Sequence, residues 1–558
     1  MFSFLLFMYM VISLSSSSSA TNLHRLQDRY SKCQLFGICD NNIELFDNVS
    51  RYVQIPIEIN GKDIYINASS SLNRFVQAKD FCEAHQIASP VCAPSIGRAI
   101  GDMLYCRAHQ QFKYRFRFIR SSEYDYTIEF DLLRDILVNN FGWVECNESN
   151  NIHTYDTNLW IFDAPIEFLP RHVTSNTMDR LFSLNSNIGN KLVLRRHMNQ
   201  EDNFMPLGFQ LDDIIREHKQ NRASYISFLK SKNIWMVKNP ILEGGTGIVG
   251  IFNNHSKLTD FILNDIAKKK SKKHYILEEY VYPPYLLAGK KFSIGIYVVI
   301  TSIDPLIVWV CNDEILVLLA IEEFNDETYD NFEMHLTNGV LLKKNKKYEQ
   351  DRNLWPTNRF KEYVGIETYE SILKQAKVII SNVVANFILE WRQDELNHAS
   401  FGPSIYGFWR FDFLIQQLDV NYKKAYLIEV ETLPSTAPRG AVDDDIAKRK
   451  VLRDMLRLAG WHPINQDIDI IMNLFEMRYN RFLESMMMIR KYSNNIISDK
   501  MKALRRVLYK FNQQLIMETN IYRPLFQEKA DWYNILASKI PLTEYDMAIK
   551  LWYEMFHT

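Results

Sequence analysis

Residues 425–435, AYLIEVETLPS, contain the pattern that decides the fold of this chain, a pair of glutamates in a predicted strand. The first half alternates as a buried strand does, and Glu429 and Glu431 then stand two positions apart, directly before a Thr-Leu-Pro-Ser break. Side chains two apart on a strand point to the same face. Two unpaired buried carboxylates would be strongly unfavourable, so the pattern requires a compensating cation.

A neighbouring predicted strand supplies a third carboxylate. The segment FDFLI, residues 411–415, carries Asp412. Three carboxylates on adjacent strands form an oxygen-rich site suited to Mg²⁺, which prefers carboxylates together with phosphate oxygens. The alternative is a pair of glutamates on a solvated sheet face, and these residues alone favour neither reading.

A glycine-rich turn lies upstream, in WMVKNPILEGGTGIVGIF, residues 235–252. Lys238 ends one predicted strand, and Gly244, Gly245 and Gly247 form the turn before the next. Such a turn lets backbone N–H groups approach phosphate oxygens, and a lysine adds positive charge. Most Gly-Gly turns are simple hairpins, and this is not a Walker loop. Together with the carboxylates, and with ILEEYV at 276–281 as an adenine-binding strand, the turn favours bound ATP and Mg²⁺.

The composition is that of a globular protein and does not indicate a particular class of binding partner. The chain has 558 residues, which at roughly 150 residues per domain suggests three or four domains. Apolar residues make up 47% and the net charge is −1. Lysine clusters at 268–273 and 343–347 are typical of solvated loops, and we expect no nucleic-acid binding.

The N-terminus predicts a secreted protein. Residues 1–20, MFSFLLFMYMVISLSSSSSA, contain an apolar run shorter than the roughly 20 residues that span a bilayer, as in a cleaved signal peptide. No other segment is predicted to cross a membrane. An even cluster of cysteines follows, which indicates up to three disulfides and a place in the secretory pathway lumen or outside the cell. The alternatives are unpaired buried thiols and a cytoplasmic, cytoskeletal protein. The clustered cysteines are Cys33, Cys39, Cys82, Cys92, Cys106 and Cys146.

From about residue 115 onward strands and helices alternate, which predicts an α/β (α+β) fold. Residues before 115 are predicted to be irregular, and those after 443 nearly all helical. The predicted strands are 114–119, 158–165, 233–240, 250–254, 274–281, 291–301, 306–313, 314–320, 407–416 and 425–431. The predicted helices are 129–143, 209–220, 258–270 and 369–396.

The order of lysine, glycine turn, strand pair, aspartate and Glu-x-Glu resembles the ATP-grasp fold, and its details resemble the tubulin–tyrosine ligase-like family, in a divergent, polyglutamylase-like form. The match runs from about Tyr114 to Gly460. The segments that carry it are WMVKNP…GGTGI, the stretch 276–310 that begins ILEEYVYPPYLLAGKKFSIG, HLTNGV at 335–340, FDFLI…AYLIEVETLPS and DDDIAKRKVLRDMLRL at 443–458.

The resemblance implies a domain order. The expected segments are a signal peptide (1–20), a cysteine-containing extension (21–114), a small α/β domain (115–195), an ATP-grasp central domain (196–310), an ATP-grasp C-terminal domain with the metal site (311–460) and a helical tail (461–558).

The resemblance also implies site roles. Lys238 and Lys291 would contact ATP, with the loop through Gly247 covering the phosphates and Glu278 and Val281 at the adenine hinge. Thr337 and Asn338 would lie beside the phosphates and the incoming amino acid. Asp412 and Glu429 match metal ligands, and Glu431, where the family usually has Asn, would still offer an oxygen.

Two departures bear on activity. The family reads Lys-Phe-Asp-x-Arg where this chain has Lys291, Phe292, Ser293, Ile294 and Gly295. The missing Arg normally anchors the incoming amino acid or the acceptor, so a charge-assisted contact is lost. Arg410 replaces a usual Gly; it faces the same way as Asp412 and would either restore the charge or occlude the site.

The resemblance predicts an ATP- and Mg²⁺-dependent ligase. It would convert a carboxylate of a protein acceptor, tubulin or a luminal protein, to an acyl phosphate, which the amino group of a free amino acid, glutamate by preference, then attacks. The alternative is a catalytically impaired nucleotide-binding interaction protein. The tail carries an apolar stripe at helical spacing beside basic residues, which predicts packing on the ligase core in preference to a tubulin-binding face. The stripe is Met501, Leu504, Leu508, Phe511 and Leu515, and the basic residues are Lys500, Lys502, Arg505, Arg506 and Lys510.

Overall fold

The structure is a computed structural model, and its description covers parts of the chain. The described core comprises residues 188–198, 200–213, 234–240, 247–262, 275–337, 345–393, 405–432, 434–438 and 442–459. Shorter described pieces are 52–59, 62–69, 74–85, 96, 115–119, 131–141, 143–145, 157–160, 179–180, 216, 475, 477–482, 504, 507–508, 511–512, 515, 522–525, 535 and 542–556.

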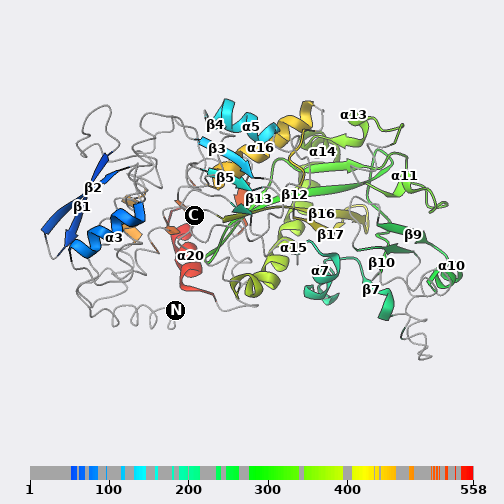
Figure 1. The fold of residues 1–558 in the computed structure, drawn as a ribbon. Helices are drawn as coiled ribbons and strands as arrows, with labels where there is room; N and C mark the ends of the chain where they lie inside the picture. Colours follow the sequence, from blue (N-terminus) through cyan, green and yellow to red (C-terminus); the bar gives the residue numbers. More distant parts are fainter. Residues whose placement is uncertain are drawn as a thin grey trace.

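A nine-stranded sheet forms the centre of the molecule (Figure 1). Its long strand β12 (Lys290–Ile303) pairs antiparallel with β13 (Leu306–Cys311), β14 (Leu316–Leu319) and β16 (Ile405–Gln417). Strand β17 (Lys423–Glu431) pairs with β16 in turn. The remaining strands are β6 (Asp179–Arg180), β11 (Leu286–Leu287), β15 (Leu354–Trp355) and β18 (Tyr522–Pro524). The predicted domain boundary at 310/311 therefore falls inside β13.

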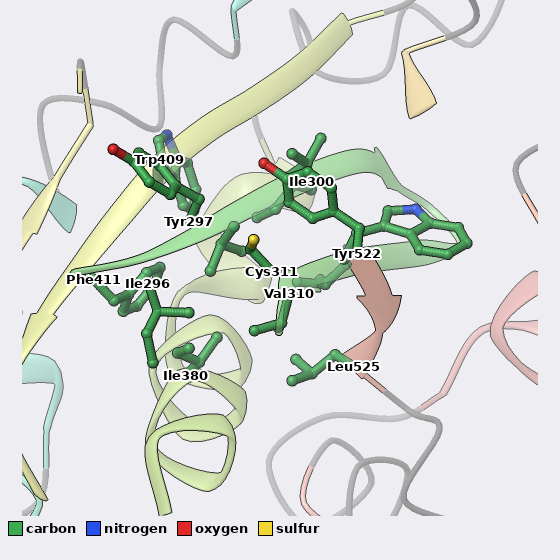
Figure 2. Packing of buried hydrophobic residues seen from close by; sticks show 14 of the residues in the cluster. Ile296, Tyr297, Ile300, Val310, Cys311, Ile380, Trp409, Phe411, Tyr522 and Leu525 are labelled. Carbon is green, nitrogen blue, oxygen red and sulfur yellow. The ribbon is translucent and has the colours of Figure 1, made fainter. Parts of the chain in front are cut away.

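Helix α15 (Ile366–Gln393) packs in the core beside this sheet. Its apolar positions recur at helical spacing, as the sequence predicts, and the helix begins three residues earlier than expected. Figure 2 shows Ile380 of α15 beside Ile296 and Phe411 of the sheet; all three are almost fully buried. The face of the helix that contacts the sheet is therefore part of the main hydrophobic core.

Helix α15 is also long and apolar enough to cross a membrane, judged by length and composition. The expectation that no segment beyond the N-terminus has this property is wrong for the described residues. Within the most apolar window of the helix, 61% of the residues are buried inside the protein. This burial is typical of the core helix of a folded domain, which has the same composition as a membrane span because it too is surrounded by apolar groups.

A second sheet has four antiparallel strands in the order β7-β10-β8-β9. They are β7 (Gly208–Gln210), β8 (Trp235–Lys238), β9 (Ile248–Phe252) and β10 (Ile276–Glu279), with helix α10 (His255–Asp260) beside β9. Trp235 and Val237 pack on one face and Met236 on the other, so β8 is buried on both sides. Phe209 and Gln210, predicted to begin a helix, instead form β7, because they complete the sheet beside β10.

The N-terminal pieces include regular structure that the sequence analysis expects to be irregular. Strands β1 (Tyr52–Ile59) and β2 (Lys62–Ser69) pair antiparallel, and helix α3 (Arg74–Ala84) follows, with Cys82 buried in it. The other five N-terminal cysteines and residues 1–20 lie outside the described residues. Alternating β-branched residues in β1 and β2 are the signal that the sequence reading passed over.

The predicted small α/β unit contains a three-stranded parallel sheet in the order β4-β3-β5. Its described elements are β3 (Arg115–Ile119), α5 (Asp131–Asp135), a π-helical turn η2 (Ile136–Asn140), β4 (Val144–Glu145) and β5 (Thr157–Trp160). The other described helices are α7 (Lys191–His197), η5 (Gln200–Asp202), α11 (Phe332–His335), α13 (Gln350–Asn353), α14 (Thr357–Val364), α16 (Val442–Leu458) and α20 (Glu544–Phe556).

The tail packs on the core of the protein, as its apolar stripe predicts. Leu504, Leu508 and Phe511 are buried in the main hydrophobic cluster, and Phe511 lies 6.2 Å from Trp309 of β13 between ring centroids. Strand β18 extends the central sheet beside β13, which Figure 2 shows at Tyr522 and Leu525. Met501 and the basic residues of this stretch lie outside the described residues.

Candidate functional site

Buried and partly buried basic side chains gather where α7 and the two sheets meet. We name Lys191, Arg195, Lys238 and Lys291 the cation cluster. Lys191 and Arg195 come from α7, Lys238 from the end of β8, and Lys291 from the start of β12. Helix α7 is fixed at its N-terminus by Asn190, whose side chain accepts hydrogen bonds from the backbone N–H groups of Leu192 and Val193. The cap thus orients the two cations that the sequence analysis missed.

Glu278 of β10 contacts two members of the cation cluster. Its carboxylate forms ion pairs with Lys238 and with Arg195. Arg195 also donates from Nη1 to the carbonyl oxygen of Pro206 at 2.8 Å. Glu278 was predicted at the adenine hinge, but in this structure its carboxylate serves as a counter-ion to the cluster, 4% exposed. Val281, predicted beside it, is buried just after β10.

The cluster is electrostatically strained despite these contacts. Burial, followed by the charges of Arg195 and Lys191, lowers the pKa of Lys238 to about 7. Burial alone lowers the pKa of Arg195 to about 10 and that of Lys291 to about 7. Desolvation disfavours the charged form of a lysine unless an anion compensates it. A polyanion such as the phosphate chain of a nucleotide would supply that compensation, so the cluster fits phosphate binding.

Lys291 is held by aromatic groups. Its Nζ lies 3.9 Å from the centroid of the Tyr280 ring, a cation–π geometry. The Tyr280 hydroxyl is 2.9 Å from His335 Nδ1, and His335 Nε2 is 2.9 Å from the carbonyl oxygen of Thr328. Since a carbonyl only accepts, Nε2 carries the proton and Nδ1 accepts from Tyr280. Burial lowers the pKa of His335, which agrees with a neutral ring.

The carboxylates of β16 and β17 lie in strand register. Asp412 pairs with Glu429 and Arg410 with Glu431, while Gly295 of β12 lies opposite Asp412 on the other side. Arg410 binds both oxygens of Asp412, from Nε at 2.6 Å and from Nη2 at 2.8 Å. Lys191 Nζ lies 2.9 Å from Glu429. Burial acts to raise the pKa of Glu429, but Lys191 and the charges of Arg410 and Lys238 outweigh it and lower the pKa.

These ion pairs bear on the predicted magnesium site. Within the part of the chain that the structure describes, no group of three His, Cys, Asp or Glu side chains is arranged to hold a metal. Asp412 faces a guanidinium and Glu429 an ammonium, so the three carboxylates as they stand do not fit a three-carboxylate Mg²⁺ site. Their role as metal ligands stays a prediction, and for Asp412 it requires that Arg410 moves.

The structure brings most of the described site residues together. The charges of Glu429 and Lys291 act on Lys238, and that of Arg410 acts on Glu429, so these four belong to one electrostatic neighbourhood. Gly247 follows the glycine turn and accepts a hydrogen bond from the backbone N–H of Asn239 at 2.7 Å. Thr337 lies two residues beyond α11 and is half-buried. Gly244, Gly245 and Asn338 lie outside the described residues.

Sequence reasoning missed Lys191, Arg195, Tyr280 and His335. The signal for the first two is a capping Asn directly before a short segment, KLVLRRH, that is basic on one side. No sequence signal marks Tyr280 and His335 as partners, because they are 55 positions apart and meet through the fold.

Comparison with known proteins agrees with this geometry. The model of the tubulin-tyrosine ligase family matches residues 166–469, more than half of the chain. A tubulin monoglutamylase of Mus musculus is 27% identical over 291 residues, 49% of this chain and 22% of its own length. A probable tubulin polyglutamylase of Homo sapiens is 28% identical over 272 residues, 46% of this chain and 40% of its own length. A tubulin glycylase of Tetrahymena thermophila is 26% identical over 232 residues, 40% of this chain and 21% of its own length.

The chain therefore spans between about a fifth and two fifths of these relatives. Their names also correct one expectation. The prediction of a secretory or extracellular location is wrong, because the relatives are named for tubulin, a protein of the cytoplasmic cytoskeleton. The cytoplasmic, cytoskeletal alternative is the one that fits. An apolar, serine-rich N-terminal segment and a cluster of cysteines do not by themselves determine the cellular compartment of a protein.

The α/β fold with its antiparallel sheets and the extent of the family match lead to one conclusion. The chain belongs to the tubulin-tyrosine ligase family.

Proposed function

We propose that the chain is an ATP-dependent ligase that joins an amino acid, glutamate by preference, to a carboxylate of a protein acceptor, with tubulin as the first candidate. The observation that carries the proposal is the cation cluster, in which the buried Lys291 and the partly buried Lys238 have pKa values of about 7. Perturbed lysines at the junction of two sheets are costly for folding, and they are explained by a polyanionic ligand.

The chemistry would proceed in two transfers. An oxygen of the acceptor carboxylate attacks the γ-phosphorus of ATP, and ADP leaves. The amino nitrogen of the incoming amino acid, after losing a proton, then attacks the acyl carbon, and inorganic phosphate leaves as the amide bond forms. The cation cluster would bind and orient the phosphates and stabilise the charge that develops on them. Mg²⁺ would accompany the nucleotide and neutralise phosphate charge, with Glu429 and Glu431 as the proposed protein ligands.

A thermal-shift titration with Mg-ATP tests nucleotide binding. We expect ATP to stabilise the full chain, since a ligand that binds the folded state raises its stability. Lys238→Ala should reduce the shift, because it removes a buried cation from the phosphate site. Lys257→Ala, which changes an exposed lysine on α10, is the matched control and should leave it intact. No stabilisation of the parent protein by Mg-ATP would refute the proposal.

A second function, a nucleotide-binding protein without ligase activity, is favoured by Gly295 and Arg410. Gly295 leaves β12 without a cation at this position. Arg410, which fills the space in front of Gly295, is bound to Asp412 and is therefore not available to hold a substrate carboxylate. Incorporation of labelled glutamate into tubulin separates the two functions. Binding of ATP without incorporation of glutamate, or of glycine in a parallel assay, would favour the second function.

A further inference from the structure

Arg410 is bound to its neighbour on the same strand face. Both residues are 13% exposed at the side chain, and both Asp412 oxygens accept from the guanidinium, at 2.6 Å and 2.8 Å. A bidentate pair of this kind is charge-assisted and geometrically specific. Asp412 therefore presents a carboxylate that already has a fixed cation.

Gly295 is the reason that this arrangement fits. A Cβ atom at position 295 would lie 2.6 Å from Cδ of Arg410 and 2.9 Å from Oδ1 of Asp412. Both distances are below normal van der Waals contact, so any side chain at 295 would push Arg410 away from Asp412. Gly295 and Arg410 are thus a matched pair across β12 and β16.

Arg410 also stands among the other carboxylates. Burial acts to lower its pKa, but Asp412 and the charge of Glu431 outweigh it and raise the pKa, so the guanidinium stays charged. The charge of Arg410 likewise acts on Glu429. A permanent cation therefore sits beside Asp412, Glu429 and Glu431, the three carboxylates that the sequence analysis assigned to a metal.

We propose that Arg410 is a built-in cation of this acidic cluster, which withholds Asp412 from divalent metal and supplies positive charge in its place. The protein alone then binds divalent cations weakly, through Glu429 and Glu431, and Asp412 becomes a metal ligand only when Arg410 is displaced. The acidic cluster belongs to the proposed nucleotide site, but its binding of metal is measured in the absence of nucleotide.

The test is binding of Mn²⁺ alone, measured by electron paramagnetic resonance on the full chain without ATP. Arg410→Gln frees Asp412 and removes a repelling charge, so we expect Mn²⁺ affinity to rise by about tenfold or more. The double variant Arg410→Gln with Asp412→Asn should keep only the gain from the lost positive charge, so it should bind Mn²⁺ more weakly than Arg410→Gln alone. Gly295→Ala, which displaces the guanidinium sterically, should also raise Mn²⁺ affinity.

The matched control is Arg392→Gln, which breaks another buried Arg–Asp pair, with Asp546, in a different part of the core. It should leave Mn²⁺ affinity unchanged in the folded protein. If Arg410→Gln fails to fold, Gly295→Ala decides the matter, because it also releases Asp412 from the guanidinium. Unchanged Mn²⁺ affinity in folded Arg410→Gln or in folded Gly295→Ala, or a double variant that binds Mn²⁺ as tightly as Arg410→Gln, would overturn the inference. Because no arm contains nucleotide, failure of ATP binding remains a separate result.

Discussion

Two lysines of the cation cluster are charged only at the expense of folding free energy, because burial disfavours their protonated form. Lys238 and Lys291 have pKa values lowered to about 7, mainly by burial, whereas an unfolded lysine titrates near 10.4. Between these values the unfolded chain binds more protons, so the free energy of unfolding rises with pH through this window. Without nucleotide, the contribution of these lysines to the free energy of unfolding is therefore least favourable below about pH 7.

Nucleotide binding should show the opposite dependence on pH. Phosphate oxygens favour protonated lysine, so ATP affinity is greatest below about pH 7 and falls as the pH rises, by at most about tenfold per unit for each lysine. Calorimetry in buffers of different ionisation enthalpy should show proton uptake on binding at pH 8. An affinity that does not change between pH 6 and pH 9 would contradict the role of these lysines.

Replacing Lys291 by Met separates function from stability. The side chain is 2% exposed, and among the described residues no carboxylate forms an ion pair with it. Lys291→Met keeps the volume and removes a desolvated charge, which we expect to raise the free energy of unfolding by about 1 kcal/mol at pH 7 while weakening ATP binding. The gain should shrink toward pH 9. Chemical denaturation and ATP titration measure both effects; a loss of stability would show that the amine has a structural role.

At the scale of elements, α15 supports the sheet that carries the carboxylates. Ile380 is 0% exposed and lies in the main core, whereas Leu389 on the same helix is 50% exposed. Ile380→Ala should destabilise the protein by about 2–5 kcal/mol, because it removes buried methyl groups and leaves a cavity. Leu389→Ala, the matched control, should change stability by no more than about 0.5 kcal/mol. Equal effects in urea denaturation would contradict the assignment of the buried face.

At the scale of the whole molecule, Asp546 joins the tail to the core of the protein. It is 1% exposed on α20, and its Oδ1 accepts from the backbone N–H of Leu306 at 2.9 Å. Arg392 at the end of α15 donates to both of its oxygens, at 3.0 Å and 2.9 Å. The described part of the tail therefore belongs to the same folded body as the central sheet and is not a separate arm.

Asp546→Ala should leave Arg392 buried without its partner and destabilise the whole protein by about 3–5 kcal/mol. Glu554→Ala, which removes an exposed pair with Lys550 on the same helix, should cost no more than about 1 kcal/mol. Calorimetry should show one lowered transition for Asp546→Ala, since tail and core share a hydrophobic cluster. A normal core transition with loss of the tail alone would show that the tail folds independently.

The sequence by itself determined the class of the fold, the family, the positions of the longer strands of the two main sheets and the position of helix α15. Strand alternation around Glu429 and Glu431, the strand ending at Lys238 and the periodicity of α15 depend on local patterns, which a sequence displays directly. The apolar stripe of the tail likewise predicted its packing. The N-terminal hairpin and β7 were missed, because their short apolar patterns also suit loops and helices.

The tertiary structure alone decided how the charges are paired. Lys191 and Arg195 join Lys238 through α7, and Arg410 reaches Asp412 only because Gly295, more than 100 positions away, has no side chain. Charge interactions fall off with distance and depend on burial, and both are fixed by the approach of residues far apart in the chain. A sequence can therefore name the carboxylates and lysines of this site, but the cation that compensates each carboxylate is chosen by the fold.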